Sequence, residues 1–413
     1  MHRSYLLHLV VVIVFGLTGT VGAQQKCSPE SAETLPGKWI KDNDATAKAT
    51  AGGFPAVKLP DLLKSMDRYH ALLEKLYPDL KGNRIKWSKR VFQDSVFEGN
   101  RPGVETHFFI NKYVCSGGQL YDNIVTERSA IFIYANSLEA IAKNSGQLHD
   151  GKYDTYKGKM IYPISHRLGT HKGFDYFEPF SGGGFSAGWG LQHFRLVLIT
   201  YPGKLPFRYL TRAEIIDFLW QQMDEKEKTE TTRLKSIHPV RPKAVQDAEK
   251  EKQLERLKKD YPNNPRRAQR FLEDYKTDEQ KYDEAVKGTK ESFAKKRNRL
   301  EELEKKFEGK LNEIATLWRG NLHYSQINEN WDFTADKMND DHLCHEKELC
   351  RHGNAWIVMN EDYFDKKLPP SVPQFFTVSF GWRTNHYRSW FLERKDHWLA
   401  NFDFSTLTGM LGK

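Results

Sequence analysis

Apolar residues recur along the chain with two periods, one typical of helices and one typical of strands. The stretch 62–77 spaces its apolar residues three and four positions apart, so that they share one face of a helix. Pro78 and Gly82 follow this stretch and are expected to end the helix. The buried face is predicted to consist of Leu63, Met66, Tyr69, Leu72, Leu73 and Leu76.

Runs rich in β-branched and aromatic residues predict strands on both sides of a polar central region. Residues 104–115 and 124–134 form an expected hairpin, whose connection contains the turn residues Ser116, Gly117 and Gly118. The other predicted strands are 160–164, 194–200, 355–359 and 374–380.

Two helix starts carry capping signals. Thr211 and Glu214 have the spacing of a capping box, in which each side chain satisfies a backbone N–H at the start of a helix. Near the C-terminus, Asp403 or Ser405 is expected to cap a short helix over 402–411.

Residues 241–310 change character, with 21 basic and 16 acidic side chains and almost no β-branched residues. We expect a polar helix over 245–261, a break at 262–265, and a long helix from Arg266 toward Trp318. Its apolar residues recur at mixed steps of three and four, which is typical of an interrupted coiled-coil seam. The expected seam residues are Phe271, Tyr275, Tyr282, Val286, Phe293, Leu300, Leu303, Phe307, Leu311 and Ile314.

These elements predict an α+β fold, with an antiparallel-rich sheet body and a long, charged, coiled-coil-like helical hairpin inserted between strands that share a sheet. The alternative for this arm is a solvated helix packed along the body. The expected parts are a signal peptide (1–23), a loosely ordered N-terminal segment (24–60), the first part of the body (61–240), the helical arm (241–318) and the second part of the body (319–413).

The N-terminus has the pattern of a cleavable secretory signal, with a basic start, an apolar run from Leu6 to Leu17 and small residues up to Ala23. This run is shorter than the roughly 20 residues that span a bilayer, which disfavours an uncleaved anchor. Lys26 disfavours a lipid anchor on Cys27. We therefore expect a protein exported to the periplasm or the extracellular space, with no transmembrane segment in the mature chain.

The formal net charge of +9 arises from 63 basic and 54 acidic side chains. This modest excess is compatible with an acidic polymer or an anionic membrane face as partner, and it requires neither. The sequence has no nucleic-acid-binding motif, so no nucleic-acid partner is expected. No cofactor is expected either.

The segment around Ser186 reads Gly-Phe-Ser-Ala-Gly and matches the G-x-S-x-G pattern of serine hydrolases. That pattern requires an apolar strand before the serine and a helix after it. Pro179 disfavours a central strand before Ser186, and a strand is predicted to follow. We therefore interpret Ser186 as a loop residue, and a nucleophilic serine is the alternative.

His166, His171 and Asp175 lie beside this glycine-rich loop and have side chains that bind metals or transfer protons. The odd spacing of the two histidines places them on opposite faces of a regular strand. Partly exposed histidines are also common without a special role. If the chain has a catalytic or ligand pocket, residues 165–190 are its expected place.

The segment 341–352 is dense in potential metal ligands, namely His342, Cys344, His345, Cys350 and His352. Five residues separate the two cysteines, which exceeds the usual spacing in zinc sites. Nearby thiols tend to pair in an oxidising compartment, so we favour a Cys344–Cys350 disulfide over a metal site. Cys27 and Cys115 would then tie the N-terminal segment to the first hairpin. Four cysteines allow three pairings, and the sequence does not decide between them.

A resemblance to a known family is carried by three stretches: LPFRYLTRAEIIDFL (205–219), YFDKKLPPSVPQFFTVSF (363–380) and NFDFSTLTGMLGK (401–413). They resemble segments of uncharacterised secreted proteins of Bacteroidetes-type Gram-negative bacteria. In those proteins, too, a proline-led capping box opens a charged helical region and a D-F-x-x-L element closes the chain. The resemblance is weaker before residue 190. It implies export and a helical arm, and it implies no catalytic residue.

The leading functional hypothesis is a non-enzymatic exported binding or scaffold protein that contacts an envelope protein through residues 241–312. The alternative is a hydrolase or small-ligand-binding protein with a pocket at residues 165–190. A weaker alternative is polysaccharide binding through Trp382, Tyr387 and Trp390, although large aromatic rings are more often buried in a core.

Overall fold

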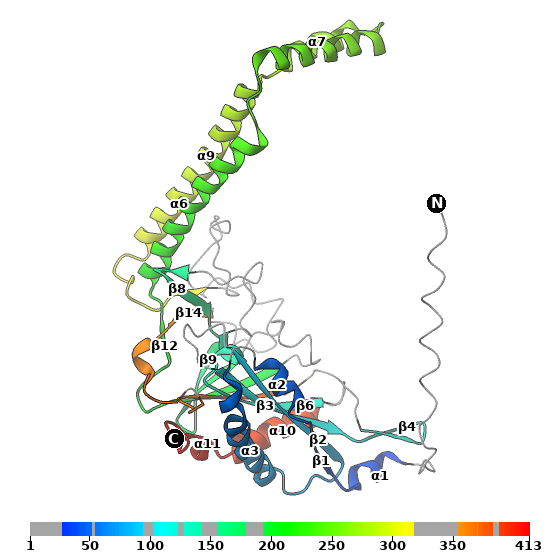
Figure 1. Cartoon of the computed structure of the whole chain (residues 1–413), viewed down its shortest axis with the longest axis vertical. Coiled ribbons are helices and arrows are strands. Elements are labelled where there is room, and N and C mark those ends of the chain that lie inside the picture. The colour runs from blue at the N-terminus through cyan, green and yellow to red at the C-terminus, as the bar shows by residue number, and fades with distance from the viewer. Residues whose placement is uncertain are drawn as a thin grey trace. The chain divides into compact units, whose positions relative to one another are not determined.

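The computed structural model describes residues 27–51, 54–93, 102–122, 128–142, 155–178, 193–317, 354–369, 371–382 and 388–413 (Figure 1). The predicted signal peptide lies outside these residues. The chain divides into two compact units. Unit 1 comprises Met1–Ser137, Ser186–Ile199 and Leu368–Lys413, and unit 2 comprises Leu138–Phe185 and Thr200–Lys367.

Unit 1 contains a sheet with the strand order β1-β2-β3-β6-β15-β11. The first strand pairs with the second in parallel, and the other neighbours pair antiparallel. The third and fourth strands in this order form the hairpin expected from the sequence. The strands are β1 (Lys38–Lys41), β2 (Asn83–Gln93), β3 (Pro102–Lys112), β6 (Arg128–Ala135), β15 (Phe376–Trp382) and β11 (His193–Ile199).

Helix α3 (Leu59–Leu76) packs on one face of this sheet. It buries all six residues of the predicted apolar face and also Leu62. The ring of Tyr69 meets that of Phe376 edge to face, with centroids 5.8 Å apart. From α10 (Arg388–Asn401), Trp398 stacks on Phe380 at 5.7 Å. The two helices therefore cover the same sheet face, because residues 376 and 380 of one strand point to the same side.

The C-terminal helix α11 spans Phe404–Thr408, which is shorter than expected, and Asp403 caps it by accepting a hydrogen bond from the backbone N–H of Thr406. Residues 27–58, part of the segment expected to be loosely ordered, contain α1 (Pro29–Thr34), β1, α2 (Ala45–Thr50) and the short 3-10 helix η1 (Ala56–Lys58). Pairing of β1 with β2 gives this segment a fixed place.

Unit 2 contains a smaller antiparallel sheet with the order β12-β14-β8-β7, in which β13 also pairs with β14. Its strands are β12 (Phe207–Tyr209), β14 (Asn354–Met359), β8 (Lys159–Pro163), β7 (Thr155–Tyr156) and β13 (Thr316–Leu317). Unit 2 also holds α4 (Glu139–Ala142), the hairpin β9 (His166–His171) and β10 (Phe174–Glu178), and the 3-10 helix η10 (Glu361–Tyr363). The helical arm leaves after β12 and returns to β13, so it is inserted between strands of one sheet. The arm begins at Arg212, whereas the predicted boundary at residue 241 assigned this first helix to the body.

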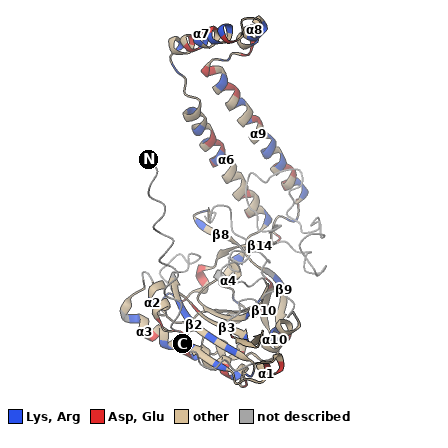
Figure 2. Cartoon of the chain, turned by 90° about the vertical axis from the view of Figure 1, so that its right-hand side faces the viewer, with Lys and Arg blue, Asp and Glu red and all other residues tan. Residues whose placement is uncertain are grey.

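The arm consists of α6 (Arg212–Ile237), α7 (Lys243–Asp260), α8 (Pro265–Asp274) and α9 (Asp278–Lys306). Helices α6 and α9 lie side by side, with acidic and basic residues distributed along both (Figure 2). Trp220 Nε1 donates to Glu304 Oε1 at 3.2 Å, and one turn further along α6, Asp224 accepts from Arg297 at 2.8 Å. The partners in α9 move backwards along the chain, so the two helices are antiparallel. The regular coiled-coil seam stays a prediction.

The expectation of one long helix from Arg266 toward Trp318 is wrong. The backbone of Tyr275 is extended, and a new capping box between Thr277 and Gln280 starts α9. The helix ends at Lys306, and Gly309 follows with a positive φ of 78°. The segment is therefore interrupted by the capping box before α9 and ends before Gly309, although its apolar residues keep a helical spacing beyond both points.

The base of the arm shares a hydrophobic core with the small sheet. Phe218, Leu219, Leu300 and Leu303 of the helix pair join Trp356 of β14 in this core. Of the expected seam residues, Phe293, Leu300, Leu303 and Phe307 are buried here, whereas Ile314 is exposed. Ile314 lies past the end of α9, where helical periodicity no longer determines which side chains face the core.

The capping box at the start of α6 is present as expected: Thr211 Oγ1 accepts from the Glu214 N–H at 3.3 Å, and Glu214 Oε2 accepts from the Thr211 N–H at 3.0 Å. Thr211→Ala removes one cap bond and is expected to lower the free energy of unfolding by about 1 kcal/mol in urea denaturation. Thr229→Ala, in the exposed middle of the same helix, is the matched control and should change it by less than about 0.5 kcal/mol. Equal effects at the two sites would contradict this role of the cap.

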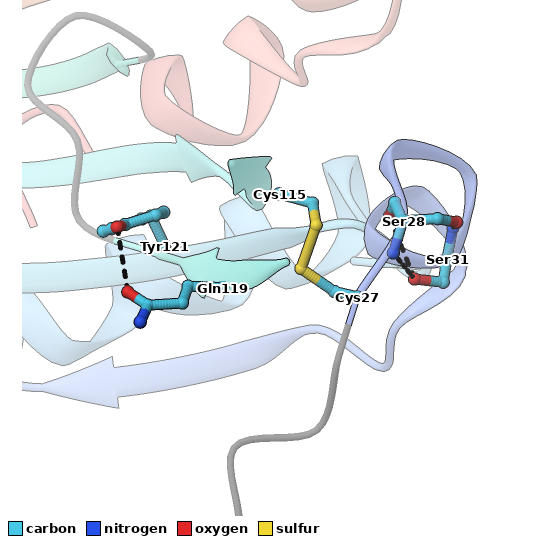
Figure 3. Close-up of a disulfide and its surroundings, with 6 residues drawn as sticks. All are labelled: Cys27, Ser28, Ser31, Cys115, Gln119 and Tyr121. Atoms are coloured by element: carbon cyan, nitrogen blue, oxygen red, sulfur yellow. Dashed lines mark hydrogen bonds between the residues drawn. A yellow bond between two sulfur atoms is a disulfide. The ribbon is translucent and has the colours of Figure 1, made fainter. Parts of the chain in front are cut away.

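A disulfide joins Cys27 to Cys115 of the ribbon formed by β4 (Val114–Ser116) and β5 (Gln119–Tyr121), within the β3–β6 connection (Figure 3). The Cα atoms are 5.8 Å apart, and the Cys27 N–H donates to the carbonyl of Gly118 at 3.2 Å. The structure therefore contains one of the pairings that the sequence left open. Cys344 and Cys350 lie outside the described residues.

Candidate functional site at the arm tip

The arm tip, residues 237–277, comprises the end of α6, all of α7 and α8, and the cap of α9. Its internal anchor is Gln246, whose side chain is buried. Gln246 Nε2 donates to the carbonyl of Arg241 at 2.7 Å, and its Oε1 accepts from the N–H of Asp278 at 2.8 Å. Tyr275 also donates from its hydroxyl to the Gln246 carbonyl at 3.2 Å. These bonds fix α7 on the first turn of α9.

Ion pairs around Arg241 reinforce this anchor. Its Nε and Nη2 donate to the two carboxylate oxygens of Asp278 at 2.7 and 3.1 Å, and its Nη1 donates to Glu249 at 2.7 Å. The hydrogen bonds from Arg241 are the largest influence that holds the pKa of Asp278 below its usual value. A bidentate guanidinium–carboxylate pair has a defined orientation, so it sets the direction of α7 relative to α9.

Large apolar side chains are concentrated on the surface of the arm tip. Of the eight large apolar residues exposed among the described parts of the chain, five belong to it, and they are 42% to 53% exposed. These residues are Ile237, Val240, Val245, Tyr261 and Leu272. One of them, Val245, lines a groove of about 360 Å³ on α7 together with Ala244, Ala248, Glu249 and Lys252. The high share of exposed apolar residues in this one segment of the described chain makes the arm tip a candidate interaction surface.

The arm tip is also basic, with eleven Lys and Arg against seven Asp and Glu in residues 237–277, an excess of four. Lys and Arg are distributed along α7 and α8 in Figure 2. Arg267 lies over the ring of Tyr261, with the guanidinium carbon 3.9 Å from the centroid, so the two side chains present one joint surface. Positive charge around exposed apolar groups favours a partner with carboxylates at its edge.

The structure places His166, His171 and Asp175 of the predicted 165–190 site in the β9–β10 hairpin, where each lies beside a different residue. Asp175 is engaged by Arg167, with Arg167 Nη2 2.7 Å from Asp175 Oδ1. The half-buried His171 has its ring 5.9 Å from that of Tyr176. His166 is the first residue of β9, where it pairs with Glu178, and a bulge between Tyr176 and Phe177 changes the register. Ser186 lies outside the described residues.

The predicted ligands His342, Cys344, His345, Cys350 and His352 also lie outside the described residues. Within the parts of the chain that the structure describes, no three His, Cys, Asp or Glu side chains are grouped as a metal site.

Two of the three aromatic residues considered for polysaccharide binding, Trp382 and Trp390, belong to the described residues. Trp382 is buried in β15, as the core interpretation predicts. Trp390 is half-buried, with its ring 4.9 Å from that of Phe391 and beneath Arg394 at 5.3 Å. Tyr387 lies outside the described residues. A buried Trp382 offers no face for a sugar ring.

The sequence predicted a partner contact through residues 241–312 and did not distinguish the tip of the arm from the rest of it. Phe271 and Tyr275 were predicted to belong to the apolar seam. In the structure both are half-buried, and the neighbouring Leu272 is exposed. A sequence signal for the tip was available: apolar residues such as Val240 and Val245 do not fit the predicted seam and lie in the polar region that contains the break at 262–265.

Helices in the described ranges are all too short or too polar to cross a membrane. No protein-family model matches the chain, and no match was found among curated proteins or solved structures.

Proposed function

We propose that this is an exported binding or scaffold protein of the cell envelope, which holds an acidic partner protein at the arm tip. The observation that carries the proposal is the concentration of exposed apolar side chains within a basic surface at the end of a helix pair. Exposed apolar side chains among charged ones have the composition of a protein interface. The role requires no catalysis.

The helix pair acts as a spacer in this proposal. Helix α6 has 26 residues, which corresponds to a length of about 39 Å at 1.5 Å per residue. The shared core at its base fixes it to the small sheet, and the Arg241–Asp278 anchor fixes α7 at its other end. A coiled-coil-like seam would keep this spacer stiff. Export is supported by the secretory pattern of the first 23 residues and by the resemblance to secreted proteins.

The test compares capture of envelope proteins by three forms of the immobilised mature chain. The tip variant carries Val245→Ser, Tyr261→Ser and Leu272→Ser, which remove exposed apolar groups. The control variant carries Glu225→Ser, Lys228→Ser and Lys235→Ser at exposed positions of α6.

We expect one envelope protein to be cross-linked to residues 237–277 of the wild type and of the control variant. The tip variant should lose at least about tenfold in affinity, because a few residues carry most of the binding energy of an interface and tyrosines such as Tyr261 are frequent among them. Raising the salt from about 50 to about 500 mM should weaken capture, since the attraction between the basic arm tip and an acidic partner is electrostatic. Equal capture by the tip variant would refute the proposal. Tip-dependent sedimentation with anionic phospholipid vesicles, without a protein partner, would replace it with a membrane contact.

A further inference from the structure

Ser88, His107 and Glu105 of unit 1 form a connected series of polar groups within the sheet. The hydroxyl oxygen of Ser88 contacts Nε2 of His107, and Nδ1 of the same ring lies 3.1 Å from Oε1 of Glu105. Arg90 Nη1 lies 3.5 Å from the other carboxylate oxygen. This is the order nucleophile, base and orienting carboxylate that activates a serine in acyl-transfer enzymes.

The strand register produces this arrangement. Ser88 of β2 is the direct cross-strand partner of His107 in β3, and Arg90 is the partner of Glu105. Direct partners bring their Cβ atoms to within about 5.5 Å, and residues two apart on one strand share a face. The series therefore lies on the sheet face opposite to the one that α3 covers through Trp87 and Phe108.

The surroundings of the series are aromatic and largely shielded from water. Ser88 is 6% exposed, His107 is 5% and Glu105 is 1%. The ring of His107 lies 5.0 Å from Phe109 and 6.1 Å from Phe132. Apolar rings beside the base favour an apolar group on the substrate, and a low dielectric strengthens the attraction between a carboxylate and an imidazolium.

We propose that Ser88, His107 and Glu105 form a second functional site, which hydrolyses carboxylic esters with an apolar acyl group. The Ser88 oxygen attacks the ester carbonyl carbon while its proton passes to His107 Nε2. The bond from the carbonyl carbon to the alcohol oxygen breaks, and the alcohol leaves with that proton. Water then attacks the acyl-serine and gives one proton to His107, which returns it to Ser88 as the carboxylic acid departs. Glu105 is a positioning residue, because it holds Nδ1–H and stabilises the imidazolium.

The test applies diisopropyl fluorophosphate and p-nitrophenyl butyrate to the mature, disulfide-bonded chain. We expect mass spectrometry to place one phosphoryl adduct on Ser88. Ser88→Ala and His107→Gln should lose the adduct and lower kcat/KM by at least about a hundredfold. Glu105→Gln should lower kcat more than it raises KM and shift the pH profile, with activity partly retained in Glu105→Asp.

The matched control is Ser379→Ala. Ser379 is a buried serine on the same sheet face, since it pairs with Phe132, which pairs with His107. Its removal should leave both labelling and hydrolysis intact. The tip variant should also hydrolyse the ester at the wild-type rate, which separates this site from the arm.

The decisive result comes from the wild type and does not depend on how well any variant folds. If diisopropyl fluorophosphate leaves Ser88 unmodified in the folded chain, or modifies another serine instead, the proposal is overturned. Hydrolysis of the butyrate ester by folded Ser88→Ala at the wild-type rate would overturn it as well. Ser88, His107 and Glu105 would then be a buried network that only supports the fold.

Discussion

Removing the Cys27–Cys115 disulfide is expected to lower the free energy of unfolding by about 2–4 kcal/mol. The two cysteines are 88 residues apart, so the bond restricts a long loop of the unfolded chain. The chain-entropy relation gives roughly 4.6 kcal/mol for such a loop, and relaxation of the native state lowers that value. The bond also holds α1 against the β4–β5 ribbon.

Urea denaturation of the oxidised wild type and of the variant Cys27→Ala with Cys115→Ala, both under non-reducing conditions, measures this effect. The variant should unfold at a lower urea concentration than the wild type. Limited proteolysis should then cut residues 28–37 first, because their covalent tie is lost. A change smaller than about 0.5 kcal/mol would show that contacts other than the disulfide hold this segment.

Replacing Asp67 by alanine is expected to destabilise unit 1 by about 2 kcal/mol at neutral pH. The Lys89 side chain is 1% exposed, and its ammonium donates to Asp67 and to the carbonyl of Leu63, both at 2.8 Å. Asp67→Ala leaves this buried charge with Asp44 at 3.6 Å as its nearest remaining carboxylate. Fully buried pairs lose roughly 3–5 kcal/mol in this way, but the Asp67 side chain is 43% exposed and water screens it.

Lys89→Met should cost less than Asp67→Ala, because it removes the buried charge and keeps an apolar stem of similar length. Asp61→Ala, an exposed acidic position on the same helix, is the control and should cost about 0.5 kcal/mol or less. A larger loss in Lys89→Met than in Asp67→Ala would contradict the argument from the buried charge.

The effect of Asp67 should depend on pH. Burial raises the pKa of Asp67, but hydrogen bonds from Lys89 and Lys41 and their charges outweigh it and hold the pKa below the usual value. A carboxyl with a lowered pKa in the folded state stabilises the protein above its unfolded pKa of about 3.9 and loses that contribution as the pH falls. The difference between wild type and Asp67→Ala should be full above about pH 5 and shrink below about pH 4. If the difference in free energy of unfolding between wild type and Asp67→Ala is the same at pH 3 as at pH 7, this pH dependence is contradicted.

Lys89 also explains why the sequence pattern did not predict strand β2. In β2, Ile85, Trp87 and Val91 point toward the face that α3 covers, and Lys89 occupies the inward position between Trp87 and Val91. A lysine at a buried position breaks the apolar alternation, and only the fold shows that Asp67 and Asp44 compensate it. By contrast, the apolar face of α3 holds no charged residue, so the spacing of its apolar residues was sufficient to predict it.

The Ser88–His107–Glu105 site and the arm tip differ in how much of each can be predicted from the sequence. Glu105 and His107 share a face of a predicted strand, but Ser88 joins them only through the register of the unrecognised β2. The break before α9 was readable from Thr277 and Gln280, because a capping box is a local signal. The exposed surface of the arm tip depends on how α7 sits on α9, which the buried Gln246 determines through contacts about thirty residues apart in sequence.

The most direct test of binding at the arm tip is photo-cross-linking in the cells that produce the protein. A photoreactive phenylalanine analogue replaces Val245 or Leu272 at the tip, or Lys228 in the middle of α6 as the control. We expect one discrete adduct with the same acidic envelope protein from both tip positions and none from Lys228. No adduct from either tip position, or the same adduct from Lys228, would contradict a partner held at the arm tip.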